Sequence, residues 1–192
     1  MCFKIMFVNR IAFAVSISHA FKVNTTEAIA NWESQTVLAA IKNIAGVYAQ
    51  QGFTITSILS DSKFEPLCGT LSMLGIILNT AARDEHMPKI KQHIQTLKEQ
   101  CCAIYNSLPF KTLPIRMMVE LVYSMTFWLH AFPANNGILA TISPRELIMG
   151  MRIDCLKHCM LPFGAYMQTH EQHDNSMAPH TIGAIALHPT GN

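Results

Sequence analysis

The chain has 192 residues, of which 50% are hydrophobic and 14% are charged. This length suits one domain with a substantial core, and the apolar composition excludes an intrinsically disordered chain. The formal net charge of +2 is too small to indicate a nucleic-acid-binding protein by itself, so any basic surface has to be local.

Short strands open the chain. Alternating apolar residues over 3–8 and 11–18 predict a hairpin that turns near Asn9–Arg10, and 20–23 is predicted as a third strand. The segment IAFAVSISHA also resembles the apolar part of a signal peptide, which would make the chain a small secreted or membrane-anchored protein. Arg10 interrupts that apolar run, and the run is too short to cross a bilayer. The hairpin is therefore the preferred interpretation.

A helix and a buried strand are predicted next. Asn24–Thr26 offers an N-cap, Glu27 would lie in the first turn, and apolar residues recur at helical spacing up to about Gln51. Residues 53–60 then predict a strand that delivers Asp61 to its carboxyl end.

The second half of the chain is mostly helical. The predicted elements, in order, are a strand over 73–79, a long helix that begins at Pro88, a buried helix over 117–132, a short helix that Ser143–Pro144 opens and Gly150 ends, and two strands in FGAYMQTH and TIGAIALHP. Strands followed by helices, strands and further helices predict an α/β layered domain with a mixed sheet.

Asp61 is the first candidate for chemistry. An acid at the end of a strand commonly caps a turn through its side chain. It can also belong to a carboxylate cluster that holds two divalent cations for nucleotidyl transfer. The second interpretation requires acidic partners from other elements, because one carboxylate cannot hold two metal ions.

Two other groups of residues have alternative interpretations. Cys155, His158 and Cys159 precede His170 and His173, which suggests a zinc site, but the spacing of the histidines is short, so packed or solvated side chains are favoured. The helix after Pro88 carries three lysines, which form either a solvated polar face or a surface that contacts phosphates. These lysines are Lys89, Lys91 and Lys98.

Taken in order, the motifs resemble the integrase core of copia-type LTR retrotransposon polyproteins. The matching segments are IMFVNRIAFAVSIS (5–18), VYAQQGF (47–53), DSKFEPL (61–67), EHMPKIKQHIQTLKEQ (85–100), SLPFKTLP (107–114), SPRELIMG (143–150), HCMLPFGAYMQTHEQ (158–172) and GAIALHPTGN (183–192). The resemblance implies an RNase H-like fold, a mixed five-stranded sheet flanked by helices with a short C-terminal β extension.

The resemblance also implies an active site of three acids that binds Mg²⁺ or Mn²⁺. One acid stands on the first strand, one at the end of the fourth strand and a Glu on the following helix. Asp61 matches the second position as a catalytic and metal-binding residue, but Lys4 and Lys91 stand at the other two. A divalent cation would meet two ammonium groups there, so we expect no metal binding and no catalysis.

Further expectations follow from the same resemblance. Residues 1–160 are expected to form a degenerate integrase core, and 161–192 a truncated C-terminal β extension. The segments that flank the core in the family are missing, which is typical of a fragment of a decayed element. The alternative function is a non-enzymatic module for nucleic acid or another partner, with Lys89, Lys91 and Lys98 contacting DNA weakly and without sequence preference. A homo-oligomer, an intracellular location in nucleus or cytoplasm, and no membrane association are expected.

Overall fold

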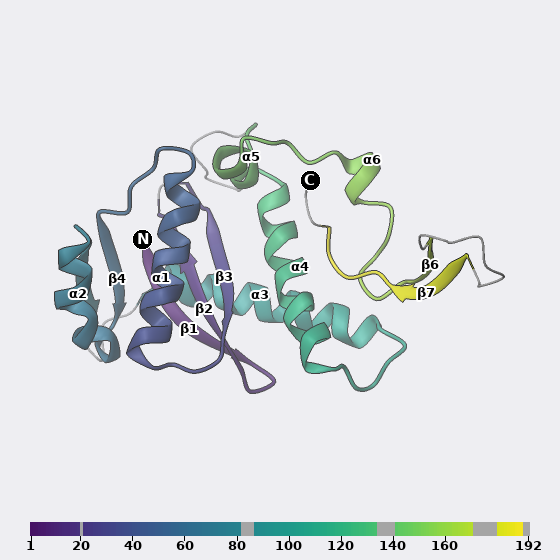
Figure 1. Ribbon diagram of the computed structural model, residues 1–192, viewed down its shortest axis with the longest axis horizontal. Helices are drawn as coiled ribbons and strands as arrows, with labels where there is room; N and C mark the ends of the chain where they lie inside the picture. The colour runs from purple at the N-terminus through teal and green to yellow at the C-terminus, as the bar shows by residue number, and fades with distance from the viewer. Residues whose placement is uncertain (20, 82–86, 134–140, 171–179, 190–192) are drawn as a thin grey trace.

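A mixed five-stranded sheet forms the centre of the protein (Figure 1). The computed structural model describes residues 1–19, 21–81, 87–133, 141–170 and 180–189. The strands are β1 (Cys2–Val8), β2 (Ile11–Ile17), β3 (Asn24–Ile29), β4 (Ser57–Asp61) and β5 (Ile77–Ala81), in the order β3-β2-β1-β4-β5. β1 is antiparallel to β2 and parallel to β4, so the predicted N-terminal hairpin is confirmed.

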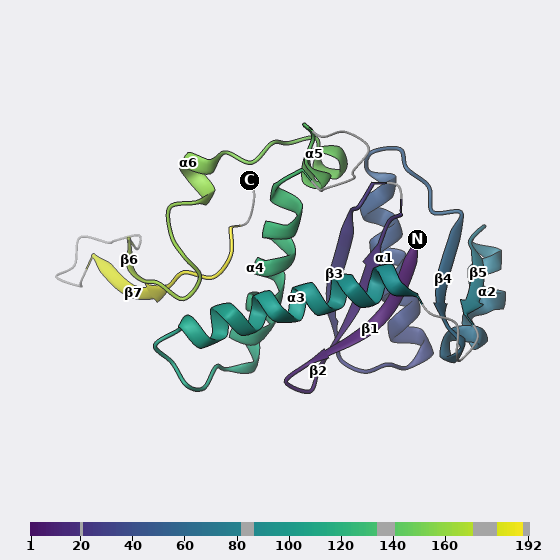
Figure 2. The same ribbon diagram turned by 180° about the vertical axis from the view of Figure 1, so that it is seen from behind.

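Helices cover both faces of this sheet. They are α1 (Ser34–Ala49), the 3-10 helix η1 (Ser62–Leu67), α2 (Cys68–Met73), α3 (Pro88–Ser107), α4 (Ile115–Ala131), α5 (Pro144–Met149) and α6 (Cys155–His158). α1 lies on the face toward the viewer in Figure 1, and α3 crosses the opposite face, as Figure 2 shows from behind. The long helix from Pro88, the buried helix after it and the short helix that ends at Gly150 are confirmed.

The alternation of side chains along the strands builds one core on each face. Phe3 of β1 and Ala14 of β2 pack toward α1, in a cluster that includes Ile41 and Ile58. Their sequence neighbours point the other way. Phe13, together with Met6 and Val15, packs against α3 and α4. Two independent apolar layers therefore fix the sheet between the helices.

The chain between β2 and α1 differs from the sequence-based prediction. Residue 20 lies outside the described residues, and 21–23 are not a strand; Lys22 and Val23 belong to a tight turn, and the third strand begins at Asn24. The predicted N-cap at Asn24–Thr26 is therefore wrong, and α1 starts only at Ser34. The β-branched Thr25 explains the outcome, because it pairs with Ser16 on β2 and their hydroxyl oxygens lie 2.7 Å apart.

The strand predicted over 73–79 is also partly wrong. Residues 68–73 form α2, Gly75 takes a positive φ of 74°, and β5 begins only at Ile77. Glycine accepts this left-handed backbone without a steric penalty, so it ends the helix and turns the chain into the strand. The apolar run in the sequence spans both elements, which hides the boundary between them.

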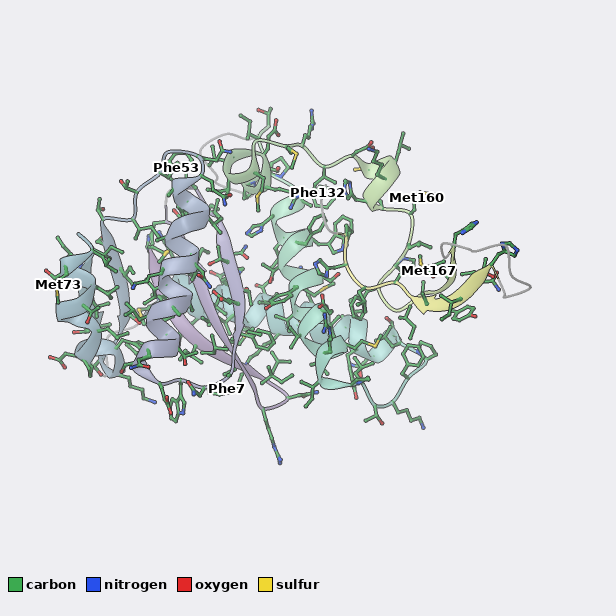
Figure 3. All side chains as sticks on the ribbon, viewed as in Figure 1. Phe7, Phe53, Met73, Phe132, Met160 and Met167 are labelled. Carbon is green, nitrogen blue, oxygen red and sulfur yellow. The ribbon has the colours of Figure 1, made fainter. Side chains whose placement is uncertain are left out.

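The C-terminal segment forms a two-stranded sheet of β6 (Tyr166–His170) and β7 (Thr181–Ile185), as predicted. It extends away from the five-stranded sheet beyond α4 (Figures 1 and 3). Many of its apolar side chains are exposed, among them Met160 and Tyr166. The side chain of His188 returns to α4, where Nδ1 lies 2.8 Å from Oε2 of Glu120. In the described residues, no helix is long and apolar enough to span a membrane.

Candidate functional site

Lys4 and Asp61 meet on neighbouring parallel strands. Cys2 of β1 stands opposite Leu59 of β4, so Lys4 lies level with Asp61, two residues further along each strand. The Nζ atom of Lys4 is 3.3 Å from Oδ2 and 3.4 Å from Oδ1 of Asp61. The side chain of Asp61 makes no capping hydrogen bond to η1, although the residue immediately precedes that helix. The carboxylate therefore pairs with a lysine instead of capping the turn.

The pair lies at a partly open edge of the sheet. The side chain of Lys4 is 25% exposed and that of Asp61 is 35% exposed. Lys4 shares its face of β1 with Cys2 and Met6, and both of those residues pack toward the face that α3 crosses. Solvent screens an ion pair that is exposed to this extent. The pair of Lys4 and Asp61 therefore holds the carboxylate in place more than it stabilises the fold.

The three lysines of α3 lie on two different flanks of the helix. Successive residues turn by about 100°, which places Lys91 and Lys98 on nearly the same flank and Lys89 about 160° away from Lys91. Lys98 lines a pocket of about 430 Å³ together with Phe7 and Asn9, at the carboxyl end of β1. Lys91 therefore faces the same end of the sheet as Asp61, whereas Lys89 faces the opposite end.

The residues around Asp61 do not suit a divalent cation. Mg²⁺ and Mn²⁺ need several oxygen ligands, and the carboxylate of Asp61 already contacts the ammonium group of Lys4. A cation at Asp61 would have to displace Lys4 or lie beside its positive charge. Among the described residues, no group of three or more His, Cys, Asp or Glu side chains is arranged to hold a metal ion.

The described cysteines and histidines of the C-terminal segment do not form such a group either. Cys155, His158 and Cys159 lie on or next to the short helix α6, where Nδ1 of His158 is 2.8 Å from the carbonyl oxygen of Asp154. His170 is at the end of β6, and His173 is outside the described residues. All six cysteines are free thiols.

A second polar cluster, which the sequence did not predict, lies on the Lys89 flank of α3. Nε2 of His19 is 3.0 Å from the sulfur of Cys2, and its Nδ1 is 3.0 Å from Nζ of Lys89. Burial lowers the pKa of His19, and the charges of Lys89, the Met1 amine and Lys22 lower it further. The signal that could have revealed this cluster is the run of polar residues in SHAFK (Ser18, His19 and Lys22), just after an apolar strand.

Two half-buried histidines, His93 on α3 and His130 on α4, lie near this cluster. Burial lowers the pKa of His93 and of His130 to about 4, and the proximity of His93 adds to the effect at His130. The backbone N–H of Asn24 donates to Nε2 of His130 at 3.0 Å. This hydrogen bond requires a lone pair on Nε2, so His130 is neutral in the folded protein.

Comparison with known proteins supports the fold and adds nothing about the site. No family model matches the sequence, and no curated protein matches it. Among solved structures, the catalytic core domain of BIV integrase matches with a TM-score of 0.52 at 14% identity, over 78% of this chain and 92% of that chain. A likeness at this identity concerns the fold alone. The mixed five-stranded sheet with helices on both faces is thus the RNase H-like fold of an integrase core, as the sequence predicted.

Proposed function

We propose that the chain is a remnant of an integrase core of the copia type that has lost polynucleotidyl transfer. The observation that carries the proposal is the ion pair between Lys4 and Asp61, with a distance of 3.3 Å between Nζ and Oδ2. It stands on the two strands where the resemblance to copia-type integrases expects two metal-binding acids. The RNase H-like fold supports the proposal, because it supplies the sheet edge on which those acids would meet.

The proposed loss of activity has an electrostatic cause. Two-metal catalysis requires carboxylates that neutralise and position both cations, and an ammonium group in their place repels them. Losing one such ligand costs several kcal/mol of transition-state stabilisation, which is about 10³-fold or more in rate. With Lys4 and Lys91 at two of the three positions, we expect activity to be below detection.

A DNA-processing assay tests the proposal. The purified chain is incubated with retroelement-end DNA and Mg²⁺ or Mn²⁺, and 3′-end processing, strand transfer and nicking are measured. We expect none of the three above the background of an Asp61→Asn variant. Metal-dependent nicking by the unmodified chain that Asp61→Asn abolishes would overturn the proposal.

A second candidate function is non-enzymatic binding of DNA. The observation that favours it is the shared flank of Lys91 and Lys98, which are both exposed; Lys98 also lines the pocket at the carboxyl end of β1. Two lysines on one flank can contact neighbouring phosphates without reading the sequence. A gel-shift titration with duplex DNA at low salt tests this function, and the absence of any binding would exclude it.

The boundary of the core is part of the same proposal. Residues 1–160 would fold as the integrase-like unit, and 161–192 would be an extension attached mainly through contacts such as His188 with Glu120. A chain that ends at residue 160 should then keep a cooperative unfolding transition. Loss of cooperative unfolding on truncation would place the boundary elsewhere.

A further inference from the structure

A small pocket lies on the Lys89 flank of α3, where the turn after β2 approaches the helix. Its volume is about 210 Å³. The residues that line it are Ile17, Ser18, His19, Lys22, Lys89, Gln92, His93 and Thr96. None of these lining residues is an acid, and four of them are lysines or histidines. Since the pKa values of His19 and His93 are lowered, the positive charge of this concave surface comes from Lys22 and Lys89.

Lys89 is held at the wall of the pocket by a chain of hydrogen bonds. An ammonium group can only donate, so Lys89 donates to Nδ1 of His19 across 3.0 Å. The proton of the neutral imidazole is then on Nε2, which faces the sulfur of Cys2 at 3.0 Å. The lowered pKa of His19 agrees with this neutral form. Lys89 keeps two N–H donors for a ligand.

Lys22 reaches the pocket from a strained turn. Its φ is +56°, a left-handed conformation that is uncommon for residues other than glycine. The turn is closed by the N–H of Ser18, which donates to the carbonyl of Val23 at 2.7 Å, and by the N–H of Lys22, which donates to the carbonyl of Ser18 at 3.2 Å. Strain of this kind persists where the surrounding structure holds the residue in place, and it often marks functional sites.

Among the described residues, no carboxylate pairs with Lys22 or Lys89. We propose that this pocket binds a phosphate group, with Lys22 and Lys89 as its two charged donors. The proposal goes beyond the loss of integrase activity, because the pocket is on the other flank of α3 from Lys91 and Lys98.

The size of the pocket limits the ligand. Pockets for drug-sized molecules and cofactors span about 300–1,000 Å³, and this one is smaller at about 210 Å³. It suits a single phosphate group more than a whole nucleotide. That group can come from free phosphate or a phosphomonoester, or from the backbone of a nucleic acid that crosses the turn after β2.

Binding is tested with inorganic phosphate and the full chain. The melting temperature is measured against phosphate concentration, with sodium chloride added to keep the ionic strength constant. We expect a saturable rise for the unmodified chain, because a ligand that binds only the folded state stabilises it. Lys22→Gln and Lys89→Gln should each weaken the apparent affinity about tenfold or more, since each removes a charge-assisted hydrogen bond. Lys42→Gln, on the outer face of α1, is the matched control.

One more variant and a DNA-binding measurement distinguish the possible explanations of a phosphate effect. Lys22→Arg should retain most of the phosphate effect, which shows that a loss in Lys22→Gln comes from charge and not from misfolding. If Lys22→Gln also weakens binding of duplex DNA, the ligand is a backbone phosphate. If DNA binding is unchanged, the ligand is free phosphate or a phosphomonoester. An unsaturable phosphate effect, or an equal effect in Lys22→Gln, Lys89→Gln and Lys42→Gln, would overturn the proposal.

Discussion

The two flanks of α3 carry the same residue type but differ in how its charge is compensated. At the carboxyl end of β4, Asp61 is paired with Lys4 of β1 at 3.3 Å, and Lys91 and Lys98 share one flank of α3. On the opposite flank, Lys89 contacts the neutral His19 and lines a pocket with Lys22, and none of the described lining residues is an acid. Positive charge thus cancels a carboxylate at one end of the sheet and accumulates at the other.

The two flanks therefore differ in what their lysines can bind. Under the proposed function, the lysine beside Asp61 takes the position that a cation would need, and we expect no metal-dependent chemistry there. Lysines without a carboxylate partner remain able to bind an anion. Each of the following predictions tests one side of this comparison.

The largest expected effect is a loss of folding stability at low pH, caused by two histidines near the Lys89 flank of α3. Burial holds the pKa of His93 and His130 at about 4 in the folded protein, below the ordinary value of 6.5 that applies to the unfolded chain. The unfolded chain therefore binds more protons between pH 6.5 and 4, and the free energy of unfolding falls as the pH is lowered through that window. From pH 7 to pH 5 the loss should be about 2 kcal/mol for each histidine.

Urea unfolding at pH 7 and pH 5 measures this loss. His130→Gln keeps an oxygen acceptor for the N–H of Asn24 and should remove part of the pH dependence. His158→Gln, in the short helix α6, is the matched control and should leave it unchanged. Equal stability of the unmodified chain at the two pH values would contradict the neutral state of the half-buried histidines.

The next largest expected effect is a loss of DNA binding through Lys91 and Lys98, on the other flank of α3. Lys91→Glu with Lys98→Glu should reduce binding of duplex DNA to the background of the assay, because both lysines lie on the flank proposed to contact phosphates. If all three lysines of α3 contacted phosphates, the log–log slope of affinity against salt would be about −2.7. With two contacts it should be about −1.8. A slope near −2.7 that Lys89→Gln lowers would show that the two flanks act together.

The smallest effect is expected from the ion pair itself. Lys4 and Asp61 are partly exposed, and pairs of this kind contribute about 1 kcal/mol or less. A double-mutant cycle with Lys4→Met and Asp61→Asn, followed by urea unfolding, measures the coupling energy between the two side chains. A coupling of several kcal/mol would mean that the ion pair contributes substantially to the stability of the fold. The pair would then be more than a remnant of the metal site proposed to be lost.

Much of the fold could be predicted from the sequence. The apolar stripe Ile90, Leu97 and Cys101 gave the long helix, and the position of Asp61 at the end of a buried strand was recognised. The third strand was missed because Thr25 and Thr26 resemble an N-cap as much as a strand, and only pairing with β2 decides between the two. Local patterns cannot supply that tertiary contact.

The candidate site could be predicted only in part. Lys4 and Asp61 were expected to meet, and they do, because the parallel register of β1 and β4 follows from the predicted fold. The cluster of Cys2, His19 and Lys89 could not be predicted, since His19 was placed next to a strand that is in fact a turn. The division of the α3 lysines between two flanks follows from helical geometry. Which other residues each flank faces depends on tertiary packing and could not be predicted.

The most direct test of the proposed loss of metal binding is a melting experiment with Mn²⁺. The unmodified chain and a variant that carries Lys4→Asp and Lys91→Glu are heated with and without the metal ion, with Lys42→Glu as a control for the change in charge. We expect no metal-dependent rise in melting temperature for the unmodified chain or the control, and a clear rise for the double variant, because binding to the folded state stabilises it. A saturable rise for the unmodified chain that Asp61→Asn removes would contradict the assignment of Lys4 and Lys91 to the acidic positions.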